Sequence, residues 1–381
     1  MFPPSNLITF LDHRSRPISR AAARYFVGAH DPAPATPSVV WSAIGKLEAR
    51  EGRRLIPLIG RLDHDAQDLD RLVQAISKTR DDAILLALSD ALAQLPAPTL
   101  RELFANENAR DKLPAALHDR LKRRVDFAGL GFDELWNKLV DQHETLADAS
   151  LHETDLDTPG DLVRALALHP DRSAVRCSEV FADSSLNDTL LHTFAVELAG
   201  VIRLEAATPH LLDLLAGDAD YVNDRAVEAL VRIGTPDVAR QTASRFFEST
   251  DIYRIYAPAV LDNIKLAESE TAALGLLRET QDFEDRSRLA LTLFSLCTTE
   301  GFDDLHRITA TEDYTDMLAD FEEEMYVLCT IQSRKVPELE TWRSRAVGRA
   351  AALEARVRSV ESRNRGSWRS TSRKAKTKKR R

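Results

Sequence analysis

Two histidine–glutamate pairs are the residues of this chain whose types best suit metal chemistry. They are His143-Glu144 and His152-Glu153, and an imidazole beside a carboxylate is a ligand set that binds iron and similar divalent metals. The chain holds 10 histidines and 60 acidic residues, so neighbours of this kind are also expected by chance. The pairs lie in a stretch of weak helical periodicity, and no third pair follows. We therefore predict no metal, no cofactor and no catalytic residue, and expect a protein that is not an enzyme.

The three cysteines are the second set that could react. Cys177, Cys297 and Cys329 include no C-x-x-C pair, which argues against zinc and dithiol motifs, and three thiols cannot form a disulfide framework. Cys297 and Cys329 stand at equivalent positions of an internal repeat and are interpreted as small apolar core residues. The N-terminus has no signal-peptide pattern, and no apolar run reaches the ~20 residues of a membrane span. These features predict a cytoplasmic protein without a transmembrane segment.

Aromatic and basic side chains between residues 240 and 256 form the predicted partner-binding set. Tyrosine and arginine are frequent anchors of protein interfaces. Aromatic side chains at this spacing also pack between stacked helices, so burial of part of the set is the alternative. The predicted residues are Arg240, Arg245, Phe247, Tyr253, Arg254 and Tyr256.

Charge is distributed unevenly along the chain. The net charge is −9, yet residues 342–381 hold 15 basic and two acidic residues, which leaves the remainder with 36 basic and 58 acidic residues and a charge of −22. Residues 363–381 are nearly free of apolar side chains and are expected to be disordered. Such a run can bind phosphates without sequence specificity, although many basic tails only solvate a chain end. The predicted phosphate-binding residues are Arg373, Lys374, Lys376, Lys378, Lys379, Arg380 and Arg381.

An internal repeat indicates which elements position these residues. Five helix ends share one pattern, and their last apolar residues lie 29, 31, 32 and 32 residues apart. This interval is typical of solenoids built from helix pairs. Together with 44% hydrophobic and 6% aromatic residues, it favours an all-α chain. The aligned residues are Leu204, Ile233, Ile264, Leu296 and Leu328.

The clearest unit shows how each helix pair begins and ends. Between residues 225 and 233, apolar residues recur at three- and four-residue spacing, which predicts an amphipathic helix. Gly234 permits the left-handed conformation that ends this helix, and Thr235 and Pro236 suit the cap and first turn of the next one. Thr208 repeats the cap one unit earlier. We expect the second helices of the pairs to form a concave binding face.

The segment from Arg225 to Ala239 resembles the HEAT-repeat superfamily, in particular bacterial HEAT-like repeats of the bilin-lyase type. The resemblance covers residues 190–345 with decreasing clarity. It implies stacked antiparallel helix pairs in a curved α-solenoid, commonly used as a protein-binding scaffold, and does not imply lyase activity. HEAT-like iron hydroxylases carry His-Glu ligands at the repeat interval, which the pairs here lack. HEAT-like DNA glycosylases carry a basic concave face, which the acidic body opposes.

The last part of the sequence predicts a helix and a tail. From residue 339 on, apolar residues at steps of three and four predict a long helix that caps the solenoid, with helix-mediated dimerisation as the alternative. An acidic run from Asp313 to Glu324 precedes it. We interpret this run as a solvated face, with docking of a cationic partner or of the tail itself as the alternatives.

These observations define a predicted organisation and function. The fold is predicted to be an all-α, HEAT-like α-solenoid with a long C-terminal capping helix. Its parts are an N-terminal helix and Pro-rich linker (1–40), degenerate helical repeats (41–185), regular HEAT-like repeats (186–336), the capping helix (337–362) and a disordered basic tail (363–381). The predicted function is a non-catalytic scaffold that binds a partner protein in the solenoid groove. The alternative is a nucleic-acid-associated adaptor that uses the tail for phosphate contacts.

Overall fold

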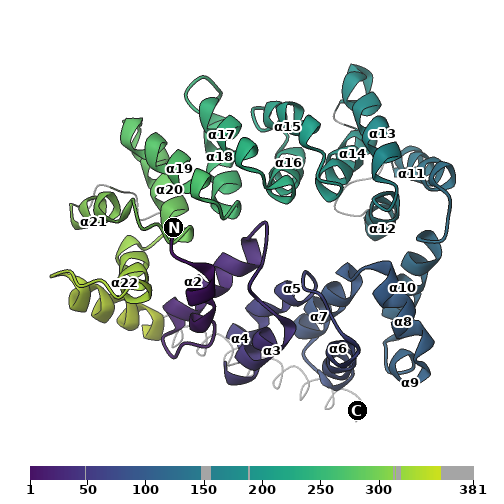
Figure 1. Ribbon diagram of the computed structural model, residues 1–381, viewed down its shortest axis with the longest axis horizontal. Helices are drawn as coiled ribbons and strands as arrows, with labels where there is room; N and C mark the ends of the chain where they lie inside the picture. Colours follow the sequence, from purple (N-terminus) through teal and green to yellow (C-terminus); the bar gives the residue numbers. More distant parts are fainter. Residues whose placement is uncertain (48, 147–155, 188, 312–313, 315–318, 353–381) are drawn as a thin grey trace, which may run out of the picture.

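The computed structural model describes residues 1–47, 49–146, 156–187, 189–311, 314 and 319–352. Every regular element in these ranges is a helix, which confirms the all-α prediction for this part of the chain. Figure 1 shows the helices following one another around a closed ring, so that the first and last elements meet. The N-terminal elements form one arc of the ring and the C-terminal elements form the other.

The first arc consists mainly of short helices. Its elements are α1 (Pro4–Leu7), η1 (Ile8–Phe10), α2 (Arg16–Gly28), α3 (Pro37–Lys46), α4 (Ala49–Gly52), η2 (Arg53–Leu55), α5 (Ile56–Ile59), α6 (Ala66–Lys78), α7 (Asp82–Gln94), α8 (Ala97–Ala105), α9 (Glu107–Arg110) and α10 (Ala115–Phe127). The expected N-terminal helix is α2, and the Pro-rich segment 31–37 forms the connection to α3.

The second arc contains the regular repeat. Its elements are α11 (Phe132–Leu146), α12 (Asp157–Leu166), α13 (Pro170–Ala182), η3 (Ser184–Leu186), α14 (Leu190–Val201), η4 (Glu205–Ala207), α15 (Thr208–Leu214), α16 (Asp220–Ile233), α17 (Pro236–Ser244), α18 (Asp251–Asn263), α19 (Ala267–Glu279), α20 (Phe283–Ser295), α21 (Phe302–Ala310) and α22 (Phe321–Ile331). The aligned apolar residues fall at or near the C-terminal ends of α14, α16, α18, α20 and α22, so the sequence interval corresponds to every second helix.

The second arc has an inner and an outer layer. Helices α14, α16, α18, α20 and α22 pack in series, and α15, α17 and α19 do the same on the outside (Figure 1). Helix α2 packs against α18, α20 and α22, which places the first helix of each pair on the inside. The prediction that second helices form the concave face is therefore wrong. Small residues explain the difference, because Gly200 on α14 and Ala229 on α16 allow the inner helices to stack closely, as the inside of a ring requires.

The clearest repeat unit caps its helices as its sequence predicts. Gly234 ends α16 with a φ of 62°, in the left-handed region, and the Thr235 hydroxyl accepts a hydrogen bond from the backbone N–H of Val238 at 3.4 Å. Thr208 differs, because the 3₁₀ turn η4 leads directly into α15 and leaves Thr208 inside the first turn, where it caps nothing. Arg203 takes the left-handed turn after α14 with a φ of 53°.

The ring closes through contacts between segments far apart in the sequence. Arg24 on α2 forms a bidentate ion pair with Glu324 on α22, with N–O distances of 2.9 and 2.7 Å. The backbone N–H of His30 donates to the Asn263 carbonyl at 2.8 Å, and the backbone N–H of Lys265 donates to His30 Nδ1 at 3.0 Å. The N-terminal helix is therefore packed into the end of the second arc.

Protonation of His30 should weaken this closure. Because His30 Nδ1 accepts a hydrogen bond, it carries no proton in the closed ring. Burial lowers the pKa of His30, and the nearby charges of Arg203, Arg61 and Lys265 act in the same direction, against the charge of Asp31. The unfolded chain binds this proton more readily, so the stability from neutral His30 is present above about pH 6.5 and is lost as the pH falls below it. We expect the free energy of unfolding to fall from pH 7 to pH 5, and to fall less in His30→Gln, by urea denaturation.

A substitution of His210 is the control for this measurement. Burial lowers its pKa as well, but it lies on α15 and pairs with His192 at 2.9 Å, outside the closure. His210→Gln should therefore leave the His30-dependent part of the pH effect in place. Equal pH dependence in the parent and in His30→Gln would contradict the role of His30.

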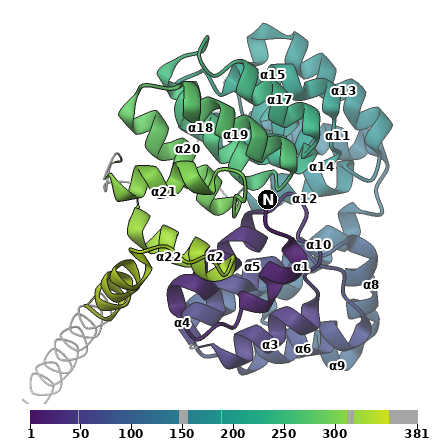
Figure 2. The same ribbon diagram turned by 60° about the vertical axis from the view of Figure 1, so that its left-hand side comes forward.

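A further helix follows α22. Residues 339–352 are helical, and Figure 2 shows this segment leaving the body of the ring. Trp342 and Ala346 are buried, and Arg349 Nη2 lies 2.8 Å from Asp320 Oδ1 and 3.1 Å from Glu322 Oε2. The described part of the predicted capping helix therefore packs against α22 and neutralises part of the acidic run. Residues 353–362, the tail and part of the acidic run lie outside the described residues.

Candidate functional site

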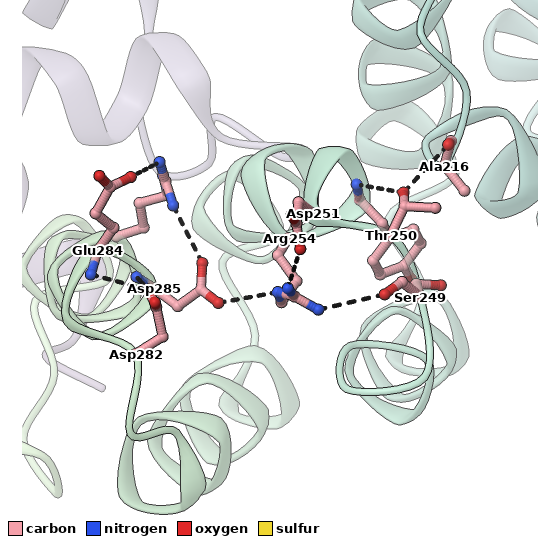
Figure 3. A network of polar contacts seen from close by, with 10 residues as sticks. Ala216, Ser249, Thr250, Asp251, Arg254, Asp282, Glu284 and Asp285 are labelled. Carbon is pink, nitrogen blue, oxygen red and sulfur yellow. Dashed lines mark hydrogen bonds and ion pairs between the residues drawn. The ribbon is translucent and has the colours of Figure 1, made fainter.

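Arg254, one of the predicted partner-binding residues, belongs to a network that joins two helices (Figure 3). Its guanidinium pairs with Asp251 on its own helix and lies 3.0 Å from Asp285 on α20. It also donates to the Ser249 carbonyl at 3.3 Å, and Arg288 approaches the same Asp285 at 3.1 Å. Because its charge is balanced within the fold, Arg254 holds α18 and α20 together.

The other two predicted arginines are also paired. Arg245 follows α17 and pairs with Asp213 on α15, so it links two outer helices. Arg240 lies 3.3 Å from Asp237 within α17. Both residues belong to the outer layer and therefore do not contribute to the inner face of the ring.

The predicted aromatic residues do not share one surface. Tyr253 is fully buried, and its hydroxyl donates to the Thr242 carbonyl at 2.9 Å, so it packs between helices and cannot touch a partner directly. Phe247 is 47% exposed in the turn after α17, on the outer layer. Tyr256 lies on α18, half-buried, and its hydroxyl donates to Asp220 at 3.2 Å.

Tyr256 lines a groove between two inner helices, α16 and α18. The groove has a volume of about 440 Å³ and is lined by Tyr221, Asp224, Arg225, Val227, Glu228, Ile255, Tyr256 and Ala259. Ile255 is 49% exposed there, which leaves an apolar side chain open to solvent. Arg225 lies 2.8 Å from Glu228 and over the ring of Tyr221, so its charge is balanced within the groove.

All three cysteines are buried free thiols, which confirms the predicted core positions of Cys297 and Cys329. Burial raises the pKa of Cys177 and Cys297 to about 12 and that of Cys329 to about 11. A thiol needs its thiolate form to act as a nucleophile or metal ligand. None of the three is suited to either role at neutral pH.

Several predicted features lie partly or wholly outside the described residues. His143 and Glu144 are in the last turns of α11, whereas His152, Glu153 and the seven basic tail residues are not described. Within the described ranges, no three or more His, Cys, Asp and Glu side chains are grouped closely enough to hold a metal ion. No one helix in those ranges has both the length and the apolar character needed to cross a membrane; α7 and α8 pass that test together, with a bend of 110° between them.

A cavity that the sequence analysis did not predict lies between the two arcs. Its volume is about 610 Å³, and it is lined by the C-terminal ends of α5, α7, α10, α12, α14 and α16. Among its described lining residues, five are arginines and one is a carboxylate, Asp161. The first arc supplies Arg61 and Arg124, and the second arc supplies Arg164, Arg203 and Arg232.

Two of these arginines stabilise helix and turn ends. Arg61 donates to the Val27 carbonyl at 2.7 Å and also to the Ala29 carbonyl. Arg124, which is 6% exposed, donates to the carbonyls of Leu95, at 2.9 Å, and Ala93. Since the C-terminal end of a helix carries partial negative charge and free carbonyls, arginines there have a structural role.

The lone carboxylate of the cavity is shared among several guanidiniums. Asp161 is fully buried and lies 3.0 Å from Arg123, 3.5 Å from Arg124 and 3.7 Å from Arg164. Burial raises the pKa of Asp161, and the neighbouring arginines oppose that rise. One negative charge thus balances only part of the positive charge around it.

Arg203 and Arg232 have no ion pair and no side-chain hydrogen bond with any residue that the structure describes. Burial lowers the pKa of Arg61 and of Arg164, and the charge of Arg232 acts on both in the same direction. Burial lowers the pKa of Arg124 to about 10. The cavity therefore concentrates unbalanced positive charge within an acidic protein.

A signal for this site is present in the sequence. Arg203 and Arg232 directly precede the aligned residues Leu204 and Ile233. In the structure, Arg203 lies in the turn after α14 and Arg232 lies in the last turn of α16, so both arginines are close to the C-terminal end of an inner helix. The net charge hides this pattern, because it averages over all 51 basic and 60 acidic residues of the chain.

Comparison with known proteins finds no family model that matches the chain and no similar curated protein. The arginine-lined cavity and the groove between α16 and α18 are therefore assigned from their geometry.

Proposed function

We propose that this chain is a HEAT-like α-solenoid closed into a ring, and that it acts as a non-catalytic scaffold binding a partner protein in the groove between α16 and α18. The observation that carries this proposal is the exposed side chain of Ile255 beside the half-buried Tyr221 and Tyr256 on the inner layer. The repeat interval of 29 to 32 residues and the serial packing of every second helix support the solenoid.

The charges around the groove define the kind of partner. Asp220, Asp224 and Glu228 surround the apolar floor, and Arg225 is already paired with Glu228. A segment with one apolar side chain flanked by lysine or arginine complements this arrangement. The apolar side chain would displace water from Ile255, and the acidic rim would favour encounter with the basic segment.

Capture of the partner from native lysate, with single substitutions, tests the proposal. We expect Ile255→Glu to reduce capture at least tenfold, because it places a charge where the apolar anchor is buried. Val175→Glu on α13 is the matched control, since Val175 is 58% exposed and distant in sequence from the groove, and it should not change capture. Capture should also survive nuclease treatment and removal of residues 363–381.

The nucleic-acid adaptor is the alternative, and the same experiment separates it. Capture that disappears with nuclease or with the tail, and that Ile255→Glu leaves unchanged, would overturn the scaffold proposal. Phosphate contacts through the basic tail would then carry the function.

A further inference from the structure

Some of the arginines that line the cavity between the arcs have no ion pair or side-chain hydrogen bond within the described part of the fold. Hydrogen bonds to carbonyls account for Arg61 and Arg124, and Asp161 accounts for part of the charge of Arg164. No described residue balances Arg203 or Arg232. We propose that the cavity binds a compact small molecule carrying two or more adjacent phosphates, through Arg203, Arg232 and Arg164.

The backbone at Arg203 brings its side chain to the cavity wall. Arg203 takes the left-handed turn after α14 with a φ of 53°, as Gly234 does after α16 with a φ of 62°. Cys297 and Ser333 take the same turn after α20 and α22, so a non-glycine residue there is common to three inner helices. Of these four turn residues, Arg203 is the one that lines the cavity.

The size and charge of the cavity favour a compact polyphosphate. A volume of about 610 Å³ lies in the range of small-molecule sites, ~300–1,000 Å³. Arg203 and Arg232 have no ion pair with a described residue, and Arg164 shares Asp161 with two further arginines, so an anion with several negative charges complements this site. Guanidinium groups bind phosphate oxygens in pairs and with defined geometry. A long nucleic acid would also meet the net negative charge of residues 1–341, whereas a compact anion held in the cavity would not.

Binding at this site has a consequence for the whole ring. Arg164, Arg203 and Arg232 belong to the second arc, and Arg61 of the first arc lines the same cavity, so a ligand held by these three residues faces the first arc. A ligand that binds only the folded ring raises its stability by mass action. The proposal does not depend on the partner groove, because Ile255 is not among the residues lining this cavity.

Titration calorimetry with sodium tripolyphosphate tests the proposal. The full-length protein is used with all ten basic residues of the tail, 363–381, replaced by serine, so that the tail cannot bind the probe. We expect one tripolyphosphate per chain and a higher unfolding temperature with the probe. Arg203→Gly and Arg232→Ala should each weaken binding about tenfold or more, the usual effect of losing a charged hydrogen bond. Arg240→Ala, in the outer layer, is the matched control and should change affinity less than twofold.

Arg203→Gly separates binding from folding. Glycine suits the left-handed turn at least as well as arginine, so this variant should be no less stable than the parent while losing affinity. Tripolyphosphate binding that is equal in the parent and in both cavity variants would overturn the proposal. If inorganic phosphate binds as tightly as tripolyphosphate, the polyphosphate assignment is wrong. It is also wrong if single-stranded DNA or polyglutamate binds more tightly than tripolyphosphate and this binding depends on Arg203. Unchanged probe binding in Ile255→Glu would confirm that the two sites are separate.

Discussion

Gly200→Ala is expected to destabilise the protein by about 3 kcal/mol. A Cβ atom at Gly200 would lie 2.5 Å from the Cα atom and 2.8 Å from the Cβ atom of Ala229, far inside van der Waals contact. The nearest atom belongs to the backbone of α16, so no side-chain rotation can relieve the overlap. Helices α14 and α16 would have to separate, which breaks the tight stacking of the inner layer. Urea denaturation should show the loss as a lower midpoint.

Gly275→Ala is the matched control for this substitution. Gly275 lies within α19, and a Cβ atom there would meet nothing within 4 Å. Alanine is the better helix former, so this variant should gain about 0.5–1 kcal/mol. Replacing glycine by alanine is thus expected to lower the free energy of unfolding at Gly200 and to raise it at Gly275. A Gly200→Ala protein as stable as the parent would contradict the close approach of α14 and α16.

Local structure could be predicted from the sequence, but ring closure could not. The helix end at Gly234 and the cap at Thr235 depend on neighbouring residues only, and the structure shows both. The pairing of Arg24 with Glu324 joins residues 300 positions apart. A contact of this kind leaves no periodic pattern, because a single charged residue on a helix surface has many equivalent partners.

The periodicity of the sequence also could not predict which helix of each pair lies on the inside of the ring. Each helix of a pair has an apolar face, so the pattern shows that the pairs pack but not which helix lies inside. The packing of α2 against α18, α20 and α22 decides this. The sequence also did not show which of the predicted aromatic residues are buried. Tyr253 and Phe247 are similar in type, yet Tyr253 is fully buried and Phe247 is 47% exposed.

The arginine site was missed because charge was averaged over the body. Arg203 and Arg232 each directly precede an aligned residue, Leu204 and Ile233, so the sequence alignment that identified the repeat also contained the signal. Arg61 and Arg124 could not have been added by alignment alone. They reach the same cavity only because the first arc returns to face the second, which is a property of ring closure.

Asp161→Asn is the second substitution with a large expected effect, a loss of about 3 kcal/mol. The carboxylate is fully buried and lies within 4 Å of three guanidiniums, those of Arg123, Arg124 and Arg164. Asparagine keeps the volume but removes the charge that balances them. Arg124 is 6% exposed and cannot recover its hydration in place. Asp90→Asn is the control, because Asp90 pairs with Arg120 at 3.1 Å but is 47% exposed, and its loss should cost about 0.5 kcal/mol.

Asp161→Asn should also change how strongly the proposed ligand stabilises the protein. Without the Asp161 carboxylate, the cavity has more uncompensated positive charge, so tripolyphosphate should raise the unfolding temperature of Asp161→Asn more than that of the parent. Thermal denaturation with and without the probe measures this difference. If Asp161→Asn is destabilised but tripolyphosphate raises its unfolding temperature no more than that of the parent, these arginines serve the fold alone. A larger gain would mean that one set of charges is balanced from within by Asp161 and from outside by a phosphate-bearing ligand.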